Sequence, residues 1–255
     1  MKTILIIGIG AGDPDYVTIQ AVKALNRVDV FFMLDKGASK RKLIALREEI
    51  CRRYIKDHPH RFLDATSPEW ERGTADYRAT IDALNEDKRA LFERLIDDGM
   101  ADGECGAFLV WGDPALYDST VRIIGAIAAE GAHGIDYEVI PGITAPQALA
   151  AKHKTTLNRI GESVHITTGR RLAEGFPADA DSVLVMLDAQ NAYTRFANQD
   201  LEIFWGAYVG MPDEILIAGK LKDVASEIAR VRAKLRAANG WIMDTYLMRR
   251  GNRDA

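Results

Sequence analysis

The residues near the start of the chain that could do chemistry form a glycine-rich turn. Gly8, Gly10 and Gly12 follow an apolar run, residues 3–7, that has the composition of a parallel strand buried on both faces. Glycine lets a ligand approach the main chain closely, and the amide groups of such a turn can donate hydrogen bonds. The stretch therefore predicts a ligand-binding loop at the end of a strand.

The spacing of this turn departs from the dinucleotide-binding fingerprint, whose third glycine falls on Asp13. In that motif a helix starts at once, with its N-terminus aimed at a pyrophosphate. Here Pro14 and Asp15 intervene, and the best predicted helix start is Thr18, a good N-cap residue. An NAD(P)-dependent oxidoreductase, with Asp35 as its ribose carboxylate, therefore stays open only as an alternative.

Length and composition bound the class of protein. With 255 residues and a net charge of -4, we expect one large or two small domains and no global attraction for nucleic acid. No apolar run reaches the roughly 20 residues needed to span a bilayer, and no export signal is evident. We therefore expect a cytoplasmic protein without membrane partners.

Cysteine and histidine spacing does not predict a metal site. Cys51 and Cys105 lack metal-ligand spacing, which fits a reducing compartment. His58 and His60 flank Pro59 without a third candidate ligand nearby, so a surface turn is the better interpretation.

The elements that must position the first loop alternate between strand and helix up to residue 140, which is typical of a parallel sheet. We expect strands at 3–7, 28–34, 61–65, 106–111 and 137–140, and helices beginning at Thr18 and covering 39–54, 76–98 and 119–130. Further strands, expected at 163–168, 182–187, 203–209, 214–218 and 241–247, are separated by less helix, which indicates a mixed sheet. The arginines of a helix at 223–238 are interpreted as solvent-exposed.

Two more predicted strands end in loops of the same chemistry as the first. Gly112, Asp113 and Pro114 follow the strand at 106–111, and the small residues at 141–145 follow the strand at 137–140. Any one of these could be an ordinary turn. Their recurrence at strand ends predicts one crevice lined by accessible backbone. Asp35 would lie at the same edge of the sheet, although a role as a helix cap or turn residue is at least as good an interpretation.

Four motifs, in order along the chain, are together similar to the tetrapyrrole methylase family. They are GIGAGDPDYVT from Gly8, WGDPALY from Trp111, VIPGITA from Val139 and VLVMLD from Val183, and the resemblance covers essentially the whole chain. Members of this family use S-adenosylmethionine to methylate ring carbons of cobalamin and sirohaem precursors. The resemblance implies two α/β domains, at 1–141 with a parallel sheet and 142–255 with a mixed sheet, the cofactor in the cleft between them, and a homodimer.

The resemblance also implies which residues contact the cofactor. Ala11 stands where the family usually has proline, and Met186 would otherwise be explained by plain core packing. The implied cofactor contacts are Gly10, Ala11, Gly112, Asp113, Leu116, Thr144, Ala145, Met186, Leu187, Tyr208 and Ala218.

Within the family, residues 8–37 are most similar to enzymes that methylate precorrin-5 at C1 and release an extruded carbon as acetate. Methyl transfer from a sulfonium needs mainly alignment, worth roughly 7 to 11 kcal/mol at the extreme. Acetate release needs water and acid–base help. Asp35 is the candidate for that role and Asp13 the second, although both could simply be loop hydrogen-bonders.

A macrocycle with many carboxylates should meet cations from several loops. Lys36, Lys40 and Arg41 follow one predicted strand, and Arg170 and Arg171 follow another. Each of these alone is more often solvated than functional. A non-catalytic tetrapyrrole-binding protein is the remaining alternative.

Overall fold

The structure, a computed structural model, describes residues 1–35, 41–68 and 77–251. The chain forms two compact units. The first contains Met1–Gly10 and Pro14–Thr144, and the second contains Ala11–Asp13 and Ala145–Ala255. The predicted domain boundaries, 1–141 and 142–255, stay a prediction.

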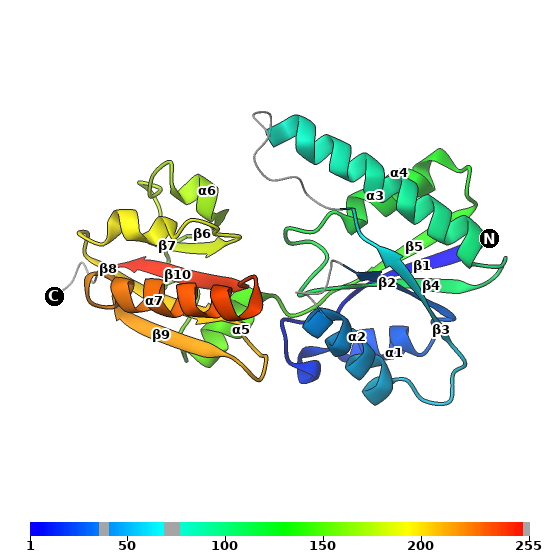
Figure 1. The fold of residues 1–255 in the computed structure, drawn as a ribbon, viewed down its shortest axis with the longest axis horizontal. Helices are drawn as coiled ribbons and strands as arrows, with labels where there is room; N and C mark the ends of the chain where they lie inside the picture. Colours follow the sequence, from blue (N-terminus) through cyan, green and yellow to red (C-terminus); the bar gives the residue numbers. More distant parts are fainter. Residues whose placement is uncertain (36–40, 69–76, 252–255) are drawn as a thin grey trace. The chain divides into compact units, whose positions relative to one another are not determined.

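The first unit is built on a five-stranded, wholly parallel sheet, as predicted (Figure 1). Its strand order is β3 (Arg61–Thr66), β2 (Val30–Asp35), β4 (Cys105–Val110), β1 (Lys2–Gly8) and β5 (Ile135–Ile140). A parallel arrangement brings the carboxyl ends of all five strands to one edge.

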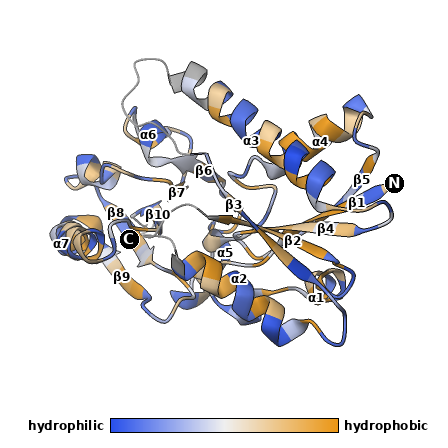
Figure 2. Ribbon diagram, turned by 45° about the vertical axis from the view of Figure 1, so that its right-hand side comes forward, coloured by the Kyte–Doolittle hydropathy of each residue, from blue (hydrophilic) through white to orange (hydrophobic). Residues whose placement is uncertain are grey.

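The central strand β1 is buried on both faces, as its composition predicts. Ile4 and Ile6 belong to one hydrophobic core, and Leu5 and Ile7 belong to another. Helices α3 (Tyr77–Gly99) and α4 (Thr120–Glu130) cover the first face, and α1 (Ile19–Leu25) and α2 (Arg41–Tyr54) cover the second (Figures 1 and 2). The unbroken apolar run is therefore explained by two cores that share one strand.

Helix α1 begins where its cap residue predicts. The Thr18 hydroxyl accepts a hydrogen bond from the Ala21 amide at 3.0 Å. A single turn of 3-10 helix, Pro14–Tyr16, fills the chain between the glycine turn and this cap. The glycine turn is thus separated from the helix N-terminus, which is the feature that argued against a pyrophosphate site.

The second unit contains a mixed five-stranded sheet, again as predicted. Its order is β6 (Val164–Thr168), β7 (Ser182–Met186), β10 (Asp244–Arg250), β8 (Leu201–Ala207) and β9 (Ile215–Lys220), with β6 and β7 parallel and the other neighbours antiparallel. Helices α5 (Ala145–Lys152) and α7 (Leu221–Asn239) pack on β8, and the short α6 (Gly169–Leu172) and η3 (Ala192–Phe196) were not predicted. None of the described helices is long and apolar enough to cross a membrane.

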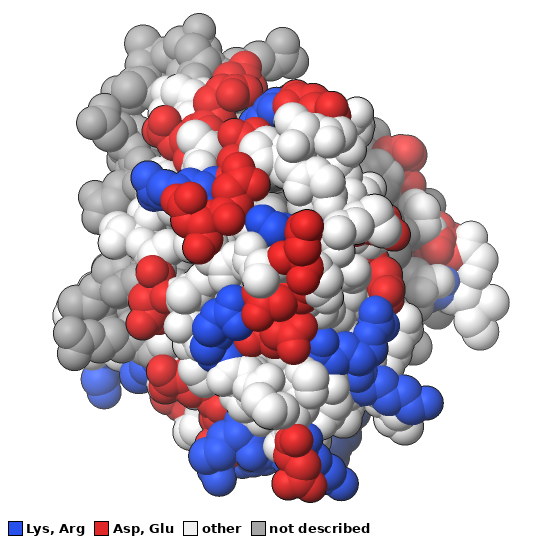
Figure 3. Space-filling model, turned by 90° about the vertical axis from the view of Figure 1, so that its right-hand side faces the viewer, with Lys and Arg blue, Asp and Glu red and all other residues white. Residues whose placement is uncertain are grey.

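Basic and acidic side chains lie intermixed on the face of the molecule shown in Figure 3. Several ion pairs of the first unit join elements that are distant in the sequence, among them Arg27 with Glu138 at 2.6 Å and Arg61 with Glu104 at 2.7 Å. Because these pairs are exposed, each contributes little to stability. On this face no field of a single sign is available to steer a charged ligand.

The prediction that the arginines of α7 are solvent-exposed is wrong for Arg232, which is 5% exposed. Its Nε donates to the Asp244 carboxylate at 2.6 Å, and its guanidinium also donates to the Asn191 side chain and the Asp188 carbonyl. Burial lowers the pKa of Arg232, but the hydrogen bond and charge of Asp244 outweigh that effect and leave the pKa raised. Arg232 is therefore a buried cation that is paired with the Asp244 carboxylate.

Arg232→Met is expected to reduce the free energy of unfolding by about 3 to 5 kcal/mol, because it leaves the Asp244 carboxylate buried without its cation. Urea unfolding followed by circular dichroism measures this. Arg230→Met, at an exposed position of the same helix, is the control and should change stability by no more than about 0.5 kcal/mol. Equal stability of the two variants would contradict the prediction.

Candidate functional site

The loops that follow β1 and β4 are tied together by their main chains. The Gly10 amide donates to the Gly112 carbonyl at 3.2 Å, and the Gly112 amide donates to the Gly10 carbonyl at 2.8 Å. The loop after β5 joins them, because the Gly142 amide donates to the Asp113 carboxylate at 2.8 Å. The loops after β1, β4 and β5, which are distant in the sequence, therefore lie against one another and are joined by hydrogen bonds.

Two glycines in these loops are required by packing. A Cβ on Gly8 would lie 2.6 Å from the Gly142 amide nitrogen. A Cβ on Gly142 would overlap the Gly112 carbonyl oxygen and lie 2.9 Å from the Gly8 Cα. Since real Cβ atoms do not approach backbone this closely, the loops of β1, β4 and β5 can meet only through glycine.

Gly112 differs from these packing glycines. Its φ is +69°, which disfavours any other residue, yet a Cβ there would meet nothing closer than the Thr144 Cα at 3.7 Å. A methyl group at Gly112 would thus make an ordinary van der Waals contact with Thr144, although Gly112 is buried. Gly112 is consequently a glycine because of its backbone conformation and not because of a packing clash.

Asp113 links two of the loops. One carboxylate oxygen accepts from the Ala115 amide at 2.7 Å and the other from Gly142. The Leu116 amide donates to the Asp113 carbonyl at 3.2 Å, which closes a tight turn. Leu116, Thr144 and Ala145 are all partly buried. The Asp113 carboxylate therefore holds the loops in place, and its remaining lone pairs are what it can offer a ligand.

In the second unit, a conformation unusual for leucine follows β7. Leu187 has a φ of +54° and leaves 65% of its surface exposed, whereas Met186 before it is partly buried. The Asp188 carboxylate fixes this turn: it accepts from the amides of Gln190 and Ala192 and from the Tyr246 hydroxyl, at 2.7 to 2.8 Å. A strained backbone that holds an apolar side chain in solvent is typical of a ligand contact.

The remaining predicted cofactor contacts in the second unit differ in how exposed they are. Tyr208 is 1% exposed: its hydroxyl donates to the Trp241 carbonyl at 2.8 Å, and its own amide and carbonyl are both hydrogen-bonded to other main chain. Ala11 is buried, and a Cβ on the adjacent Gly12 would overlap the Val209 carbonyl, which places residues 11–13 against the turn after β8. Ala218 is exposed on β9.

The predicted catalytic and substrate-binding residues lie in different elements of the structure. Asp35 closes β2 and pairs in register with Thr66 at the carboxyl edge of the parallel sheet, while Lys36 and Lys40 lie outside the described residues. Asp13 is partly buried in the turn before α1. Arg170 and Arg171 are exposed in α6, with Glu174 carboxylate oxygens 3.7 and 2.8 Å from their guanidinium nitrogens.

Neither the cysteines nor the histidines are arranged for nucleophilic or metal chemistry. Burial raises the pKa of the Cys51 thiol to about 12 and that of Cys105 to about 11, so both are protonated at neutral pH. His58 lies 3.3 Å from Asp29, and a ring nitrogen of His60 lies 2.9 Å from the His58 carbonyl. Over residues 1–35, 41–68 and 77–251, no three metal-binding side chains come together.

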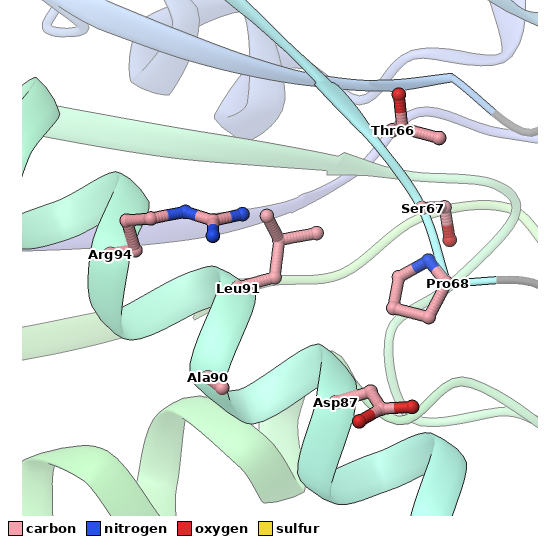
Figure 4. Close-up of a pocket in the computed structure, with 7 residues that line it drawn as sticks. All are labelled: Thr66, Ser67, Pro68, Asp87, Ala90, Leu91 and Arg94. Atoms are coloured by element: carbon pink, nitrogen blue, oxygen red, sulfur yellow. The ribbon is translucent and has the colours of Figure 1, made fainter.

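One cavity that the sequence did not predict lies beside the end of β3. It has a volume of about 370 Å³ (Figure 4). Its walls are Thr66, Ser67 and Pro68 from the strand end and Asp87, Ala90, Leu91 and Arg94 from α3. Only the contact between this strand and this helix creates the cavity, so no local signal in the sequence could have revealed it.

The fold and these loops define a class of two-unit α/β protein with glycine-rich loops at the carboxyl ends of parallel strands, the edge where ligands bind in open α/β sheets. A family model for tetrapyrrole (corrin/porphyrin) methylases matches residues 3–225, and the chain belongs to this family. Tetrapyrrole methylases use S-adenosylmethionine as methyl donor.

Individual relatives agree with this membership. A precorrin-6A synthase [deacetylating] from Sinorhizobium sp is 45% identical over 251 residues, covering 98% of this chain and 96% of the relative. A crystal structure of a cobalamin synthesis related protein, CobF, from Corynebacterium diphtheriae matches with a TM-score of 0.84 and 36% identity, over 99% of this chain and 100% of that one. A Thermus thermophilus uroporphyrin-III C-methyl transferase complexed with S-adenyl homocysteine, at 15% identity and a TM-score of 0.57 over 96% of each chain, shares the fold.

The contrast between glycines required by packing and a glycine required by its positive φ predicts different losses on substitution by alanine. Gly142→Ala should unfold the first unit or destabilise it severely, because backbone blocks the new methyl group. Gly112→Ala should stay folded, losing about 1 to 2 kcal/mol of stability for its left-handed backbone, and should bind S-adenosylhomocysteine at least roughly tenfold more weakly.

Gly131→Ala is the matched control for Gly112→Ala. Gly131 ends α4 with a φ of +72°, and a Cβ there would meet nothing within 4 Å. It should show the same stability loss in thermal unfolding and unchanged affinity in calorimetry. Unchanged affinity of Gly112→Ala would show that this loop is structural only.

Proposed function

We propose that this chain is an S-adenosylmethionine-dependent C-methyltransferase of cobalamin biosynthesis that methylates precorrin-5 at C1 and releases acetate to give precorrin-6A. The observation that carries the proposal is the 45% identity to a precorrin-6A synthase [deacetylating] across nearly the full length of both chains. The comparisons support neither alternative considered from the sequence, an NAD(P)-dependent oxidoreductase or a non-catalytic tetrapyrrole-binding protein.

The chemistry suits a site made of backbone. S-adenosylmethionine supplies an already activated methyl group, so the protein needs chiefly to hold donor and ring carbon in line and to exclude water. Main chain that is locked by glycine contacts supplies such alignment without reorganising during the reaction. Neither a thiolate nor a metal is needed for this step.

We assign the cofactor to the loops described above. The backbone of Gly112 and Gly10 would contact the methionine part, with Ala11, Asp113, Leu116, Thr144 and Ala145 beside it. Met186 and the exposed Leu187 would cover the adenine, with Tyr208 and Ala218 as further contacts. These assignments follow the family pattern residue by residue, and the exposed side chain and left-handed backbone of Leu187 support its part.

Asp35 is proposed as the acid–base residue of acetate release, with Asp13 as the second candidate. The end of β2 supports Asp35, because ligands in open α/β sheets bind at the carboxyl ends of strands. We propose that Lys36, Arg170 and Arg171 bind the carboxylates of the macrocycle. Arg170 and Arg171 form exposed ion pairs with Glu174, and because such pairs contribute little free energy, a substrate carboxylate could replace Glu174 at low cost. We further propose a cytoplasmic homodimer.

The proposal is tested by incubating the protein with methyl-labelled S-adenosylmethionine and precorrin-5. The expected result is one labelled methyl group per macrocycle at C1, located by mass and NMR, together with one equivalent of acetate. Label at another ring carbon would show that the assignment of C1 as the methylated position is wrong. No label, although both ligands bind, would leave a binding protein.

Asp35→Asn is expected to leave the affinity for S-adenosylhomocysteine within twofold of wild type and to reduce acetate release by roughly 10²-fold or more, the usual contribution of a general acid or base. Asp13→Asn is the comparison variant. If acetate release instead falls only in Asp13→Asn, the role moves to Asp13. A wild-type rate in both variants would remove these carboxylates from the mechanism.

A further inference from the structure

The cavity at the end of β3 lies on the edge of the sheet where ligands bind. Thr66 ends β3 and pairs in register with Asp35, the last residue of β2. In the strand order, β2 separates β3 from β4, whose end carries the Gly112 loop. At the usual spacing of strands the cavity is roughly 10 Å from that loop across the sheet. A large ligand that touches Gly112 can therefore extend an arm past β2 to β3.

One wall of the cavity carries a cation, Arg94. Arg94 makes no ion pair or hydrogen bond with any described residue, and its side chain is exposed. Arg89, on the same helix, is paired with both Glu93, at 2.8 Å, and Glu130. Figure 4 shows the Arg94 side chain reaching toward Leu91, with Ser67 and Pro68 on the other side of that leucine. A guanidinium kept free at a cavity is available for a planar anion.

Ser67 is a second polar residue of the same cavity wall. Its hydroxyl has no hydrogen bond within the part of the chain that the structure describes. Leu91 stands between this hydroxyl and the Arg94 guanidinium in Figure 4. The anion selectivity of the cavity therefore rests on Arg94, whose planar guanidinium suits an acceptor such as a carboxylate.

The rest of the cavity wall is suited to a short apolar stem. Leu91 is 6% exposed, and Ala90 and Pro68 stand beside it. Asp87 lies seven residues before Arg94, about 10 Å along the helix. Its negative charge repels an anion from that end of the cavity. A ligand group with a carboxylate at its tip and methylenes behind it is therefore held with the tip at Arg94.

We propose that this cavity is a subsite for one carboxylate-bearing arm of the macrocycle, with the carboxylate bound by Arg94 and its methylene stem lying on Leu91 and Pro68. The inference rests on the proposed function, because the macrocycle supplies the arm. It adds a specificity-determining residue, Arg94, that none of the sequence motifs contains.

Arg94→Gln is expected to raise the KM for precorrin-5 roughly tenfold, about the worth of one charge-assisted hydrogen bond, with kcat and the affinity for S-adenosylhomocysteine within twofold of wild type. Arg94→Lys should recover part of the loss, since it keeps the charge but not the planar fork. Arg89→Gln, on the same helix, is the matched control and should keep the wild-type KM. A wild-type KM for Arg94→Gln overturns the inference.

A binding experiment separates this inference from the proposed function. Uroporphyrin III, a stable tetrapyrrole with carboxylate arms, is titrated into each protein and followed by fluorescence. If wild type binds it and Arg94→Gln binds it roughly tenfold more weakly, at wild-type thermal stability, the subsite stands even where methylation of precorrin-5 fails. Equal binding by wild type, Arg89→Gln and Arg94→Gln, or no binding by any of them, overturns the subsite.

Discussion

The contact between the main chains of three strand ends is the constraint on which the first unit depends. Gly10 and Gly112 exchange two hydrogen bonds, and Gly142 is drawn against them by Asp113. With no side chain between them, the ends of β1, β4 and β5 cannot move separately. A ligand bound at these loops, as proposed, would meet a surface that is already in its final geometry, which is what a reaction limited by alignment requires.

The second unit fixes its own strand end by buried charge. Asp188 accepts hydrogen bonds from the turn after β7, and Arg232 binds the Asp188 carbonyl while it pairs with Asp244 at the start of β10. These contacts hold Leu187 in a left-handed conformation with its side chain in solvent. Such a network destabilises the fold strongly when one member is lost, so its value lies in fixing one geometry.

Local patterns were enough to predict most of the fold. The unbroken apolar run at residues 4–7 required a strand between two cores, and the Thr18 hydroxyl required a helix start. Arg232 was misplaced because a charged residue on a helix was taken as exposed, although Leu221, Ala225 and Ile228 put position 232 on the buried stripe. The Arg94 cavity was beyond prediction, since it needs β3 and α3 to meet in space.

The glycines of the loops have two different reasons to be glycine, and only coordinates separate them. At Gly8 and Gly142 the absent Cβ would point into backbone, so substitution breaks the packing whether or not a ligand is present. At Gly112 the absent Cβ would meet its nearest neighbour at an ordinary contact distance of 3.7 Å, and the positive φ is what disfavours other residues. A repeated glycine motif therefore mixes residues that packing requires to be glycine with a residue that the backbone conformation requires to be glycine. The contacts of the missing Cβ and the sign of φ distinguish the two cases.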